Sequence, residues 1–164
     1  MKRRIVLLSA ASALLLTACG SKFKRYNDPQ VTRVIVFKGE RKMHLMHKGK
    51  ALRSYDIDLG FAPYQHKREE GDGRTPEGNY IIDRRNPNSS FHLSIGIDYP
   101  NARDIAKARA AGVSPGGDIF IHGQPNKFAP KGPDWTAGCI AVTNKEMEQI
   151  YFMVNNGTPI TIYP

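Results

Sequence analysis

Residues 122–139 read HGQPNKFAPKGPDWTAGC, and this stretch links the end of a predicted strand to the cysteine at position 139. The apolar segment DIFIHG runs into it and ends at His122 and Gly123, while Cys139 closes it. The loop between them is rich in glycine and proline, which allows two strand ends to return close together. The stretch therefore predicts that an imidazole and a thiol meet in the folded chain.

When a thiol lies beside an imidazole, the thiol can act as a nucleophile and the imidazole can accept its proton. A free cysteine has a pKa of about 8.5 and is mostly protonated at neutral pH, so we expect an imidazolium at His122 to stabilise the Cys139 thiolate and later protonate a leaving amine. Gly138 permits a substrate backbone to approach, and nearby N–H groups can stabilise an oxyanion. No acid stands at an obvious spacing, so a carbonyl near Gly123 is the candidate group for orienting the imidazole. A buried structural histidine and an inert cysteine would explain the same letters.

The N-terminus predicts export. Lys2, Arg3 and Arg4 precede an apolar run that is too short to span a bilayer. Residues 16–20, LTACG, resemble the lipobox of bacterial lipoproteins, and an ordinary secretory signal with a chance cysteine is the alternative. The resemblance implies cleavage before Cys19 and lipidation of that residue.

The predicted domains follow from that cleavage site. They are a signal peptide (1–18), the lipidated Cys19 with a tether (19–30) and one domain (31–164). Acyl chains would anchor the protein to a membrane. Because Gly20 is not an aspartate, we expect the outer membrane, with the domain facing the periplasm.

The net charge of the chain and its number of cysteines limit the expected binding partners and the expected state of Cys139. The formal net charge is +9, and it falls to +6 once the three basic residues of the signal are removed. A basic protein favours anionic partners, and export excludes nucleic acid, so cell-wall carboxylates or membrane head groups are the expected partners unless the charges are simply solvated. With Cys19 lipidated, Cys139 has no partner for a disulfide in an oxidising compartment, which leaves an inert buried thiol or a reactive one.

Hydrophobic patterning predicts a mostly β fold with short helices, as a β-rich sandwich or a partly closed barrel. Met147, Ile150, Tyr151 and Val154 share one helix face and are expected in the core. The expected strands are 31–38, 42–59 with a turn at 48–50, 79–85, 91–98, 118–123 and 158–164. The expected helices are 101–112, capped by Asn101, and 144–157, capped by Asn144.

The chain resembles the L,D-transpeptidase catalytic domain (YkuD) family. The pattern of that family is His-Gly, a loop, then Ser or Thr, a variable residue, Gly and Cys, and here it occurs as HG at 122–123 and TAGC at 136–139. The segment GRTPEGNY at 73–80 and Asn144 also match, and the resemblance covers roughly residues 31–164. It implies a β-rich domain with Cys139 as the nucleophile, His122 as the base and the Gly123 carbonyl as the orienting group. It implies neither a metal nor an organic cofactor.

Two positions depart from the family pattern. Many members have a histidine where Ala137 stands and an arginine where Ala141 stands. In the family that arginine lies near the substrate end of the site, so its replacement by alanine bears on which acceptor is used. A subgroup with a similar Gly-Cys-Ile-Ala segment looks closer to this chain, and some of its members hydrolyse, releasing a lipoprotein from the peptidoglycan stem.

The remaining candidates concern substrate binding. Thr136 and Gly138 are expected near the oxyanion, Arg74 can pair with a stem carboxylate, and Trp135 can cover a bound peptide or pack in the core. The loop 68–74 is either a solvated connection or a substrate contact.

The other histidines give weaker signals. His44 and His47 point to opposite faces of a strand and cannot share a metal ion. His66 and His92 are expected to be surface or satisfied histidines, although His92 can line the cleft.

The sequence therefore predicts a peptidoglycan-modifying cysteine acyltransferase that acts on murein stem peptides through a Cys139 thioester. The alternative is a hydrolase of the same fold, an amidase or carboxypeptidase that cleaves stems or detaches a lipoprotein. A binder without catalysis, tethering the wall to the membrane, is the third class.

Overall fold

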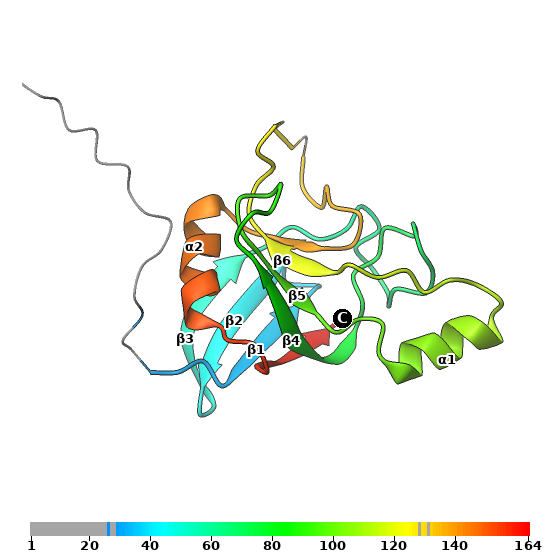
Figure 1. The fold of residues 1–164 in the computed structure, drawn as a ribbon, viewed down its shortest axis with the longest axis horizontal. Coiled ribbons are helices and arrows are strands. Elements are labelled where there is room, and N and C mark those ends of the chain that lie inside the picture. Colours follow the sequence, from blue (N-terminus) through cyan, green and yellow to red (C-terminus); the bar gives the residue numbers. More distant parts are fainter. Residues whose placement is uncertain (1–25, 27–28, 128, 131) are drawn as a thin grey trace, which may run out of the picture.

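The computed structural model describes residues 26, 29–127, 129–130 and 132–164, so the predicted signal peptide and Cys19 lie outside the described residues. The strands form an eight-stranded sheet in the order β3-β2-β1-β8-β4-β5-β6-β7. Two short helices accompany it, which confirms the expected mostly β fold (Figure 1). The elements are β1 (Arg33–Phe37), β2 (Lys42–His47), β3 (Lys50–Asp56), β4 (Gly78–Asn86), β5 (Ser94–Ile97), α1 (Ala102–Ala110), β6 (Phe120–His122), β7 (Ile140–Ala141), α2 (Asn144–Met153) and β8 (Pro159–Tyr163).

Alternation of side chains explains the first two strands. Val34, Val36, Met43 and Leu45 are all fully buried, and the residues between them are more exposed, as expected for strands with one face on the core. The turn between β2 and β3 has positive φ at Lys48 (46°) and at Gly49 (83°), which is typical of a two-residue hairpin. The hairpin predicted from 42–59 is confirmed.

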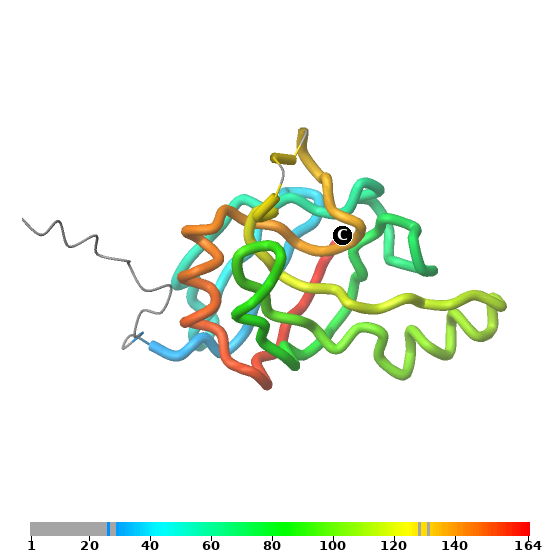
Figure 2. Tube along the Cα trace, turned by 45° about the horizontal axis from the view of Figure 1, so that its top comes forward, coloured from blue at the N-terminus to red at the C-terminus, as the bar shows by residue number. Residues whose placement is uncertain are grey.

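The C-terminal strand holds the sheet together. β8 pairs in parallel with β1 and antiparallel with β4, so the last strand of the chain lies between the first hairpin and the strands of the second half. Figures 1 and 2 show α2 packed on one side of the sheet, while α1 projects at the opposite end of the molecule. The predicted core face of α2 is buried, because Met147 and Ile150 are 0% exposed.

Capping decides where the helices begin. Asn101 caps α1 as predicted, with Asp104 completing a capping box. For α2 the predicted cap was wrong: Thr143 is the cap, and its side chain and that of Glu146 form the box. Asn144 is the first helical residue, and its side chain accepts a hydrogen bond from the Gln124 N–H instead. The helix ends at Met153 rather than at 157, because the chain turns extended at Val154 to reach β8.

Two strands near His122 and Cys139 differ from the prediction. The strand expected over 91–98 covers only Ser94–Ile97, because His92 takes a positive φ of 70° and the Leu93 N–H bonds back to the Phe91 carbonyl. The short β7 was not among the predicted strands. It forms because residues 140–141 pair in parallel with β6, a contact that local patterning does not reveal.

The long loop 61–77 is fixed by buried cations. Lys38 is 2% exposed, and its ammonium group bonds to the Glu77 carboxylate (2.8 Å) and to the carbonyls of Gln65 and Thr75. Lys67 pairs with Asp72 at 2.8 Å, and both side chains are below a tenth exposed. Because a buried charge is tolerated only when it is paired, the Lys38 contacts tie the loop to the end of β1, and the Lys67 pair holds the loop together internally.

Within the described ranges, neither helix is long and apolar enough to cross a membrane. In the same part of the chain, no group of three or more His, Cys, Asp or Glu side chains is arranged to hold a metal ion.

Candidate active site

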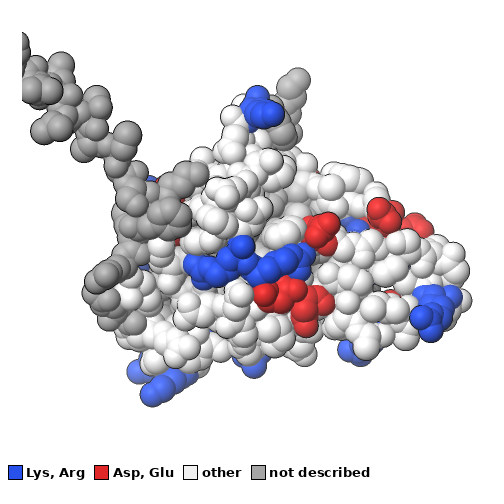
Figure 3. All heavy atoms as spheres, viewed as in Figure 1, with Lys and Arg blue, Asp and Glu red and all other residues white. Residues whose placement is uncertain are grey.

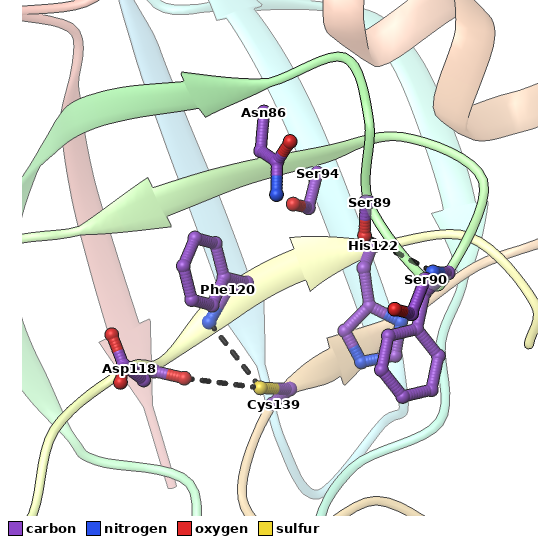
Figure 4. Close-up of a pocket in the computed structure, with 9 residues that line it drawn as sticks. Asn86, Ser89, Ser90, Ser94, Asp118, Phe120, His122 and Cys139 are labelled. Atoms are coloured by element: carbon purple, nitrogen blue, oxygen red, sulfur yellow. Dashed lines mark hydrogen bonds between the residues drawn. The ribbon is translucent and has the colours of Figure 1, made fainter.

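The two residues predicted to meet, His122 and Cys139, line the same cavity of about 300 Å³ (Figure 4). His122 ends β6 and Cys139 immediately precedes β7, and these strands pair in parallel through Ile121 and Ile140. The register therefore brings the two ends of the 122–139 loop to one edge of the sheet. The cavity is lined by Asn86, Ser89, Ser90, Phe91, Ser94, Asp118, Phe120, His122 and Cys139.

His122 is buried and held by its own backbone neighbour. Its Nδ1 lies 2.7 Å from the Gly123 carbonyl oxygen, which assigns the ring proton to Nδ1 and leaves Nε2 as an acceptor. Gly123 has no room for a side chain, because a Cβ there would lie 2.5 Å from Asn144 Oδ1. That same oxygen accepts the Gln124 N–H at 2.7 Å. Asn144, at the start of α2, thus fixes the chain that follows the histidine.

Two aromatic rings enclose the imidazole. The Phe91 ring centroid lies 4.5 Å from that of His122, and the Trp135 ring meets it edge to face at 5.6 Å. Trp135 is itself held, since its Nε1–H donates to Asp58 Oδ2 at 3.1 Å. Burial lowers the pKa of His122, although the hydrogen bond to Gly123 opposes the shift.

The Cys139 thiol points away from the imidazole in this structure. Its Sγ donates to the Asp118 carbonyl oxygen at 3.5 Å and accepts the Phe120 N–H at 3.4 Å (Figure 4). Among the described residues no hydrogen bond joins this Sγ to His122. Burial raises the pKa of the Cys139 thiol, outweighing the Phe120 N–H. The expected thiolate and imidazolium pair is therefore disfavoured at rest, because desolvation shifts both groups towards their neutral forms.

The turn that carries Cys139 is built from Thr136 and Gly138. Thr136 Oγ1 donates to the Cys139 carbonyl at 2.8 Å and accepts the Gly138 N–H at 3.1 Å. Gly138 has φ of 128°, and a Cβ there would lie 2.7 Å from the Arg74 carbonyl oxygen, so glycine is required. The Gly138 N–H is thus already engaged. The Cys139 N–H, which donates to no acceptor in the described part of the chain, is the better candidate for an oxyanion.

The structure places the other predicted residues as follows. Arg74 packs its backbone against Gly138, and its side chain is not among the residues that line the cavity. In the loop 68–74, Asp72 accepts the N–H groups of Arg68 and Arg74, so part of this loop is internally bonded. Trp135 both packs on His122 and remains partly exposed.

The other histidines have local partners. His92 was expected either to be satisfied or to line the cleft; it bonds Glu148 of α2 at 3.0 Å and does not line the cavity. His66 faces Asp104 at 3.4 Å. His44 and His47 contact Ser54 and Gln30 respectively, on separate sides of β2.

Several lining residues were not predicted. Ser94 lies opposite His122 in the β5 and β6 ladder, and Asn86 lies opposite Ser94 in the β4 and β5 ladder. Phe120 begins the strand that ends at His122, and Asp118 lies just before that strand. No motif marks these residues, and only the strand register brings them around the thiol.

Comparison with known proteins agrees with this fold. The family described as YkuD, L,D-transpeptidase catalytic domain, matches residues 31–162. Among solved structures, the helical cell shape determining protein Pgp2 from Campylobacter jejuni is 26% identical, with a TM-score of 0.64 over 84% of this chain and 49% of that one. Bd1075 of Bdellovibrio bacteriovorus is 25% identical, with a TM-score of 0.59 over 82% of this chain and 48% of that one.

More distant similarity concerns the fold alone. L,D-transpeptidase 1 of Mycobacterium tuberculosis is 14% identical, with a TM-score of 0.53 over 82% of this chain and 62% of that chain. The present chain spans about half the length of Pgp2 and Bd1075. The comparison with curated proteins gave no significant match.

Proposed function

Because this chain belongs to the YkuD family of L,D-transpeptidase catalytic domains, we propose that it is a peptidoglycan-modifying enzyme that transfers acyl groups of stem peptides through a thioester on Cys139. The observation that carries the proposal is the shared cavity of His122 and Cys139, with the imidazole Nδ1 held by Gly123. The arrangement leaves Nε2 free to accept a proton. That is what a neutral thiol needs to become a nucleophile.

Acylation starts from the neutral pair. Rotation about the Cα–Cβ bond of Cys139 takes the thiol from the Asp118 carbonyl towards His122, and Nε2 takes the Sγ proton as sulfur attacks the stem carbonyl carbon. The oxyanion is stabilised by the Cys139 N–H. The imidazolium then protonates the amine of the scissile amide, the C–N bond breaks, and a thioester remains on Cys139.

Deacylation reverses the roles. An incoming amine passes its proton to His122 Nε2 and attacks the thioester carbonyl, so that an amide forms and Cys139 leaves as a thiol with that proton. Water in place of the amine gives a carboxylic acid and hydrolysis. Transpeptidation and hydrolysis therefore share one intermediate and differ in the acceptor.

Hydrolysis is the second candidate, and Ala141 favours it. Ala141 is 1% exposed and its backbone bonds in both directions with Asp58 (2.8 and 2.9 Å), so it offers no long cation to an acceptor peptide. Enzymes of this kind would cleave stems or detach a peptidoglycan-linked lipoprotein. A role without catalysis, as a tether, is the remaining class.

Mass spectrometry of sacculi separates these reactions. Residues 20–164 and the Cys139→Ala variant are incubated with crosslinked and lipoprotein-bearing sacculi. New direct crosslinks between diamino acids, lost in the variant, indicate a transpeptidase. Released lipoprotein or shortened stems, also lost in the variant, indicate a hydrolase. Identical products from both proteins would refute the assignment of Cys139 as the nucleophile.

A carbapenem adduct tests the nucleophile independently. The wild type should form a thioester with a carbapenem, and Cys139→Ala should not. An adduct that persists in Cys139→Ala would contradict the assignment.

We also propose that Cys19 carries a lipid that anchors the domain to a membrane, with the domain facing the periplasm at the outer membrane. The sequence at 16–20 and the charged start of the chain support this proposal. Cys19→Ala should release the protein into the soluble envelope fraction. Since the printed name of Pgp2 describes a determinant of helical cell shape, loss of this protein should also be scored for altered cell shape.

A further inference from the structure

We propose that Arg84, Asp118 and Phe120 form a subsite for the free end of a diamino dicarboxylic residue in the stem, where one carbon bears both an ammonium and a carboxylate. The inference rests on the proposed function, since it concerns the stem bound at Cys139. Phe120 and Asp118 line the cavity of Cys139, and Arg84 contacts both. Figure 3 shows a strip of Lys and Arg side chains, with acidic side chains beside it, over the middle of the face that carries β4 and β5.

Arg84 is carried to the cavity edge across a neighbouring strand. It belongs to β4 and lies over β5 at Gly96, where a Cβ would be 2.6 Å from the Arg84 side chain. Only a residue without a side chain leaves this path open. The guanidinium ends over the Phe120 ring of β6, 4.5 Å from its centroid.

Hydrogen bonds fix the Arg84 guanidinium but leave part of its capacity to donate hydrogen bonds unused. Nη1 bonds to both Asp83 carboxylate oxygens at 2.8 Å and to the Ile97 carbonyl, whereas Nη2 has the Asp118 carboxylate at 3.4 Å. The Arg84 side chain is 37% exposed. One edge of the fork is thus anchored, and the other faces solvent with a long, weak contact that a carboxylate can replace.

Asp118 supplies the opposite charge beside the thiol. Its carbonyl oxygen accepts the Cys139 Sγ–H, while its carboxylate is 91% exposed and reaches Arg84. The backbone at Asp118 has a φ of 54°, so this residue does not continue the extended conformation of β6, which begins at Phe120. A cation and an anion therefore stand together next to the nucleophile.

The order of groups fits a diamino dicarboxylic residue. Its acyl carbon must lie at Cys139, its methylene chain has the Phe120 ring to pack on, and its terminal carbon then meets Arg84 and Asp118. Arg84 pairs with the carboxylate and Asp118 with the ammonium, which replaces their contact with each other. A lysine-type side chain offers only the ammonium, and an amidated end offers no carboxylate.

The test uses the full chain and three synthetic stem tetrapeptides that differ only at this end: free, amidated at the carboxyl and acetylated at the amine. Release of the terminal residue gives kcat/KM for each, whichever acceptor is used. The wild type should prefer the free stem over the amidated one by about tenfold. Its preference over the acetylated stem should be smaller, about threefold, because Asp118 is exposed and screened.

The variants should remove one preference each. Arg84→Gln should abolish discrimination against the amidated stem, Arg84→Lys should restore part of it, and Asp118→Asn should abolish discrimination against the acetylated stem. Arg53→Gln and Asp56→Asn are matched controls on β3, and should keep both preferences. If Arg84→Gln does not fold, the exposed Asp118→Asn still decides.

Two results overturn the inference in distinguishable ways. Wild-type preferences retained in folded Arg84→Gln and Asp118→Asn would exclude the subsite while leaving the proposed reaction intact. No turnover of any stem by the wild type, together with no carbapenem adduct on Cys139, would overturn the proposed function and the subsite with it.

Discussion

His122 is buried and Cys139 is half-buried at the cavity, and desolvation acts on both groups in the same direction. It raises the pKa of the thiol and lowers that of the imidazole, so the resting pair is neutral. Phe91 and Trp135 contribute to the desolvation of His122, since their rings pack against it. A neutral imidazole is the form that can accept the thiol proton. The burial that disfavours an ion pair therefore also keeps the base ready at mildly acidic pH.

The pH dependence of the two groups should show this. His122 must be neutral to act, so kcat/KM should rise with pH through a midpoint below 6.5, the ordinary pKa of histidine. Alkylation of Cys139 by iodoacetamide needs the thiolate, so its rate should rise through a midpoint above 9.0. Quenched-flow measurement of the alkylation rate at a series of pH values from about 5 to about 10 follows this dependence, because that range spans the ordinary pKa values of histidine and cysteine. A plateau in alkylation that begins below neutral pH would reveal a stable thiolate and contradict the neutral pair.

Trp135 should set the pKa of His122. Trp135→Leu removes the edge-to-face contact and admits water, so the pKa of His122 should move up towards its ordinary value. The acid limb of the activity profile should move to higher pH with it, and NMR titration of the His122 ring protons checks the shift. Tyr163→Leu is the control, because Tyr163 stacks on Phe37 of β1 and does not line the cavity. A shift of equal size in the control would show a nonspecific effect of removing an aromatic ring.

At the scale of elements, the loop 61–77 depends on the buried Lys38. Burial lowers the pKa of Lys38, and the ion pair with Glu77 opposes that shift. The ammonium reaches three acceptors from one end of β1, so it couples the loop to the sheet beside the Thr75–Gly78 segment. The same loop supplies Arg74, whose carbonyl packs against Gly138 next to the nucleophile.

Removing Lys38 should therefore cost much more than removing an exposed lysine. Lys38→Ala leaves the Glu77 carboxylate and two carbonyls without their partner, and should lower the free energy of unfolding by about 3–5 kcal/mol. Lys42→Ala removes a pair with Asp56 whose side chains are 42% and 85% exposed, and should cost about 0–1 kcal/mol. Urea denaturation of both variants measures the difference. Equal losses would mean that burial of the Lys38 pair adds nothing to stability.

At the scale of the whole molecule, β8 joins the two halves of the sheet. It is the parallel partner of β1 and the antiparallel partner of β4, and its Ile160 and Ile162 are buried. Apart from β8, the first half of the sheet reaches the strands that carry the cavity through shorter contacts, such as the two backbone hydrogen bonds between Asp58 and Ala141. The site at β6 and β7 thus depends on the last strand of the chain, although that strand contributes none of its lining.

Truncation should show this dependence. Deletion of residues 159–164 exposes unpaired edges on β1 and β4 and removes buried isoleucines, so the chain should lose its cooperative thermal transition. Deletion of Pro164 alone should retain it. Circular dichroism during heating distinguishes the two. A cooperative transition in the longer deletion would mean that the halves fold independently.

Much of the fold and the central pair of residues could be predicted from the sequence. Hydrophobic patterning identified the β1 to β3 strands and β8, Asn101 identified the start of α1, and the lone Cys139 with His122 at a strand end indicated the position of the site. These features are local, because alternation, capping and turn chemistry depend on neighbours within a few residues. The catalytic roles of the two residues stay predictions.

Only the tertiary structure decided the environment of that pair. The protonation state follows from rings at 91 and 135, the orientation of the thiol follows from Asp118 and Phe120, and the polar wall follows from the register of β4, β5 and β6. The short β7 and the cap at Thr143 likewise depend on which segments pair and where the chain must turn. Desolvation and strand pairing are set by residues far apart along the chain, so a local pattern carries no direct record of them.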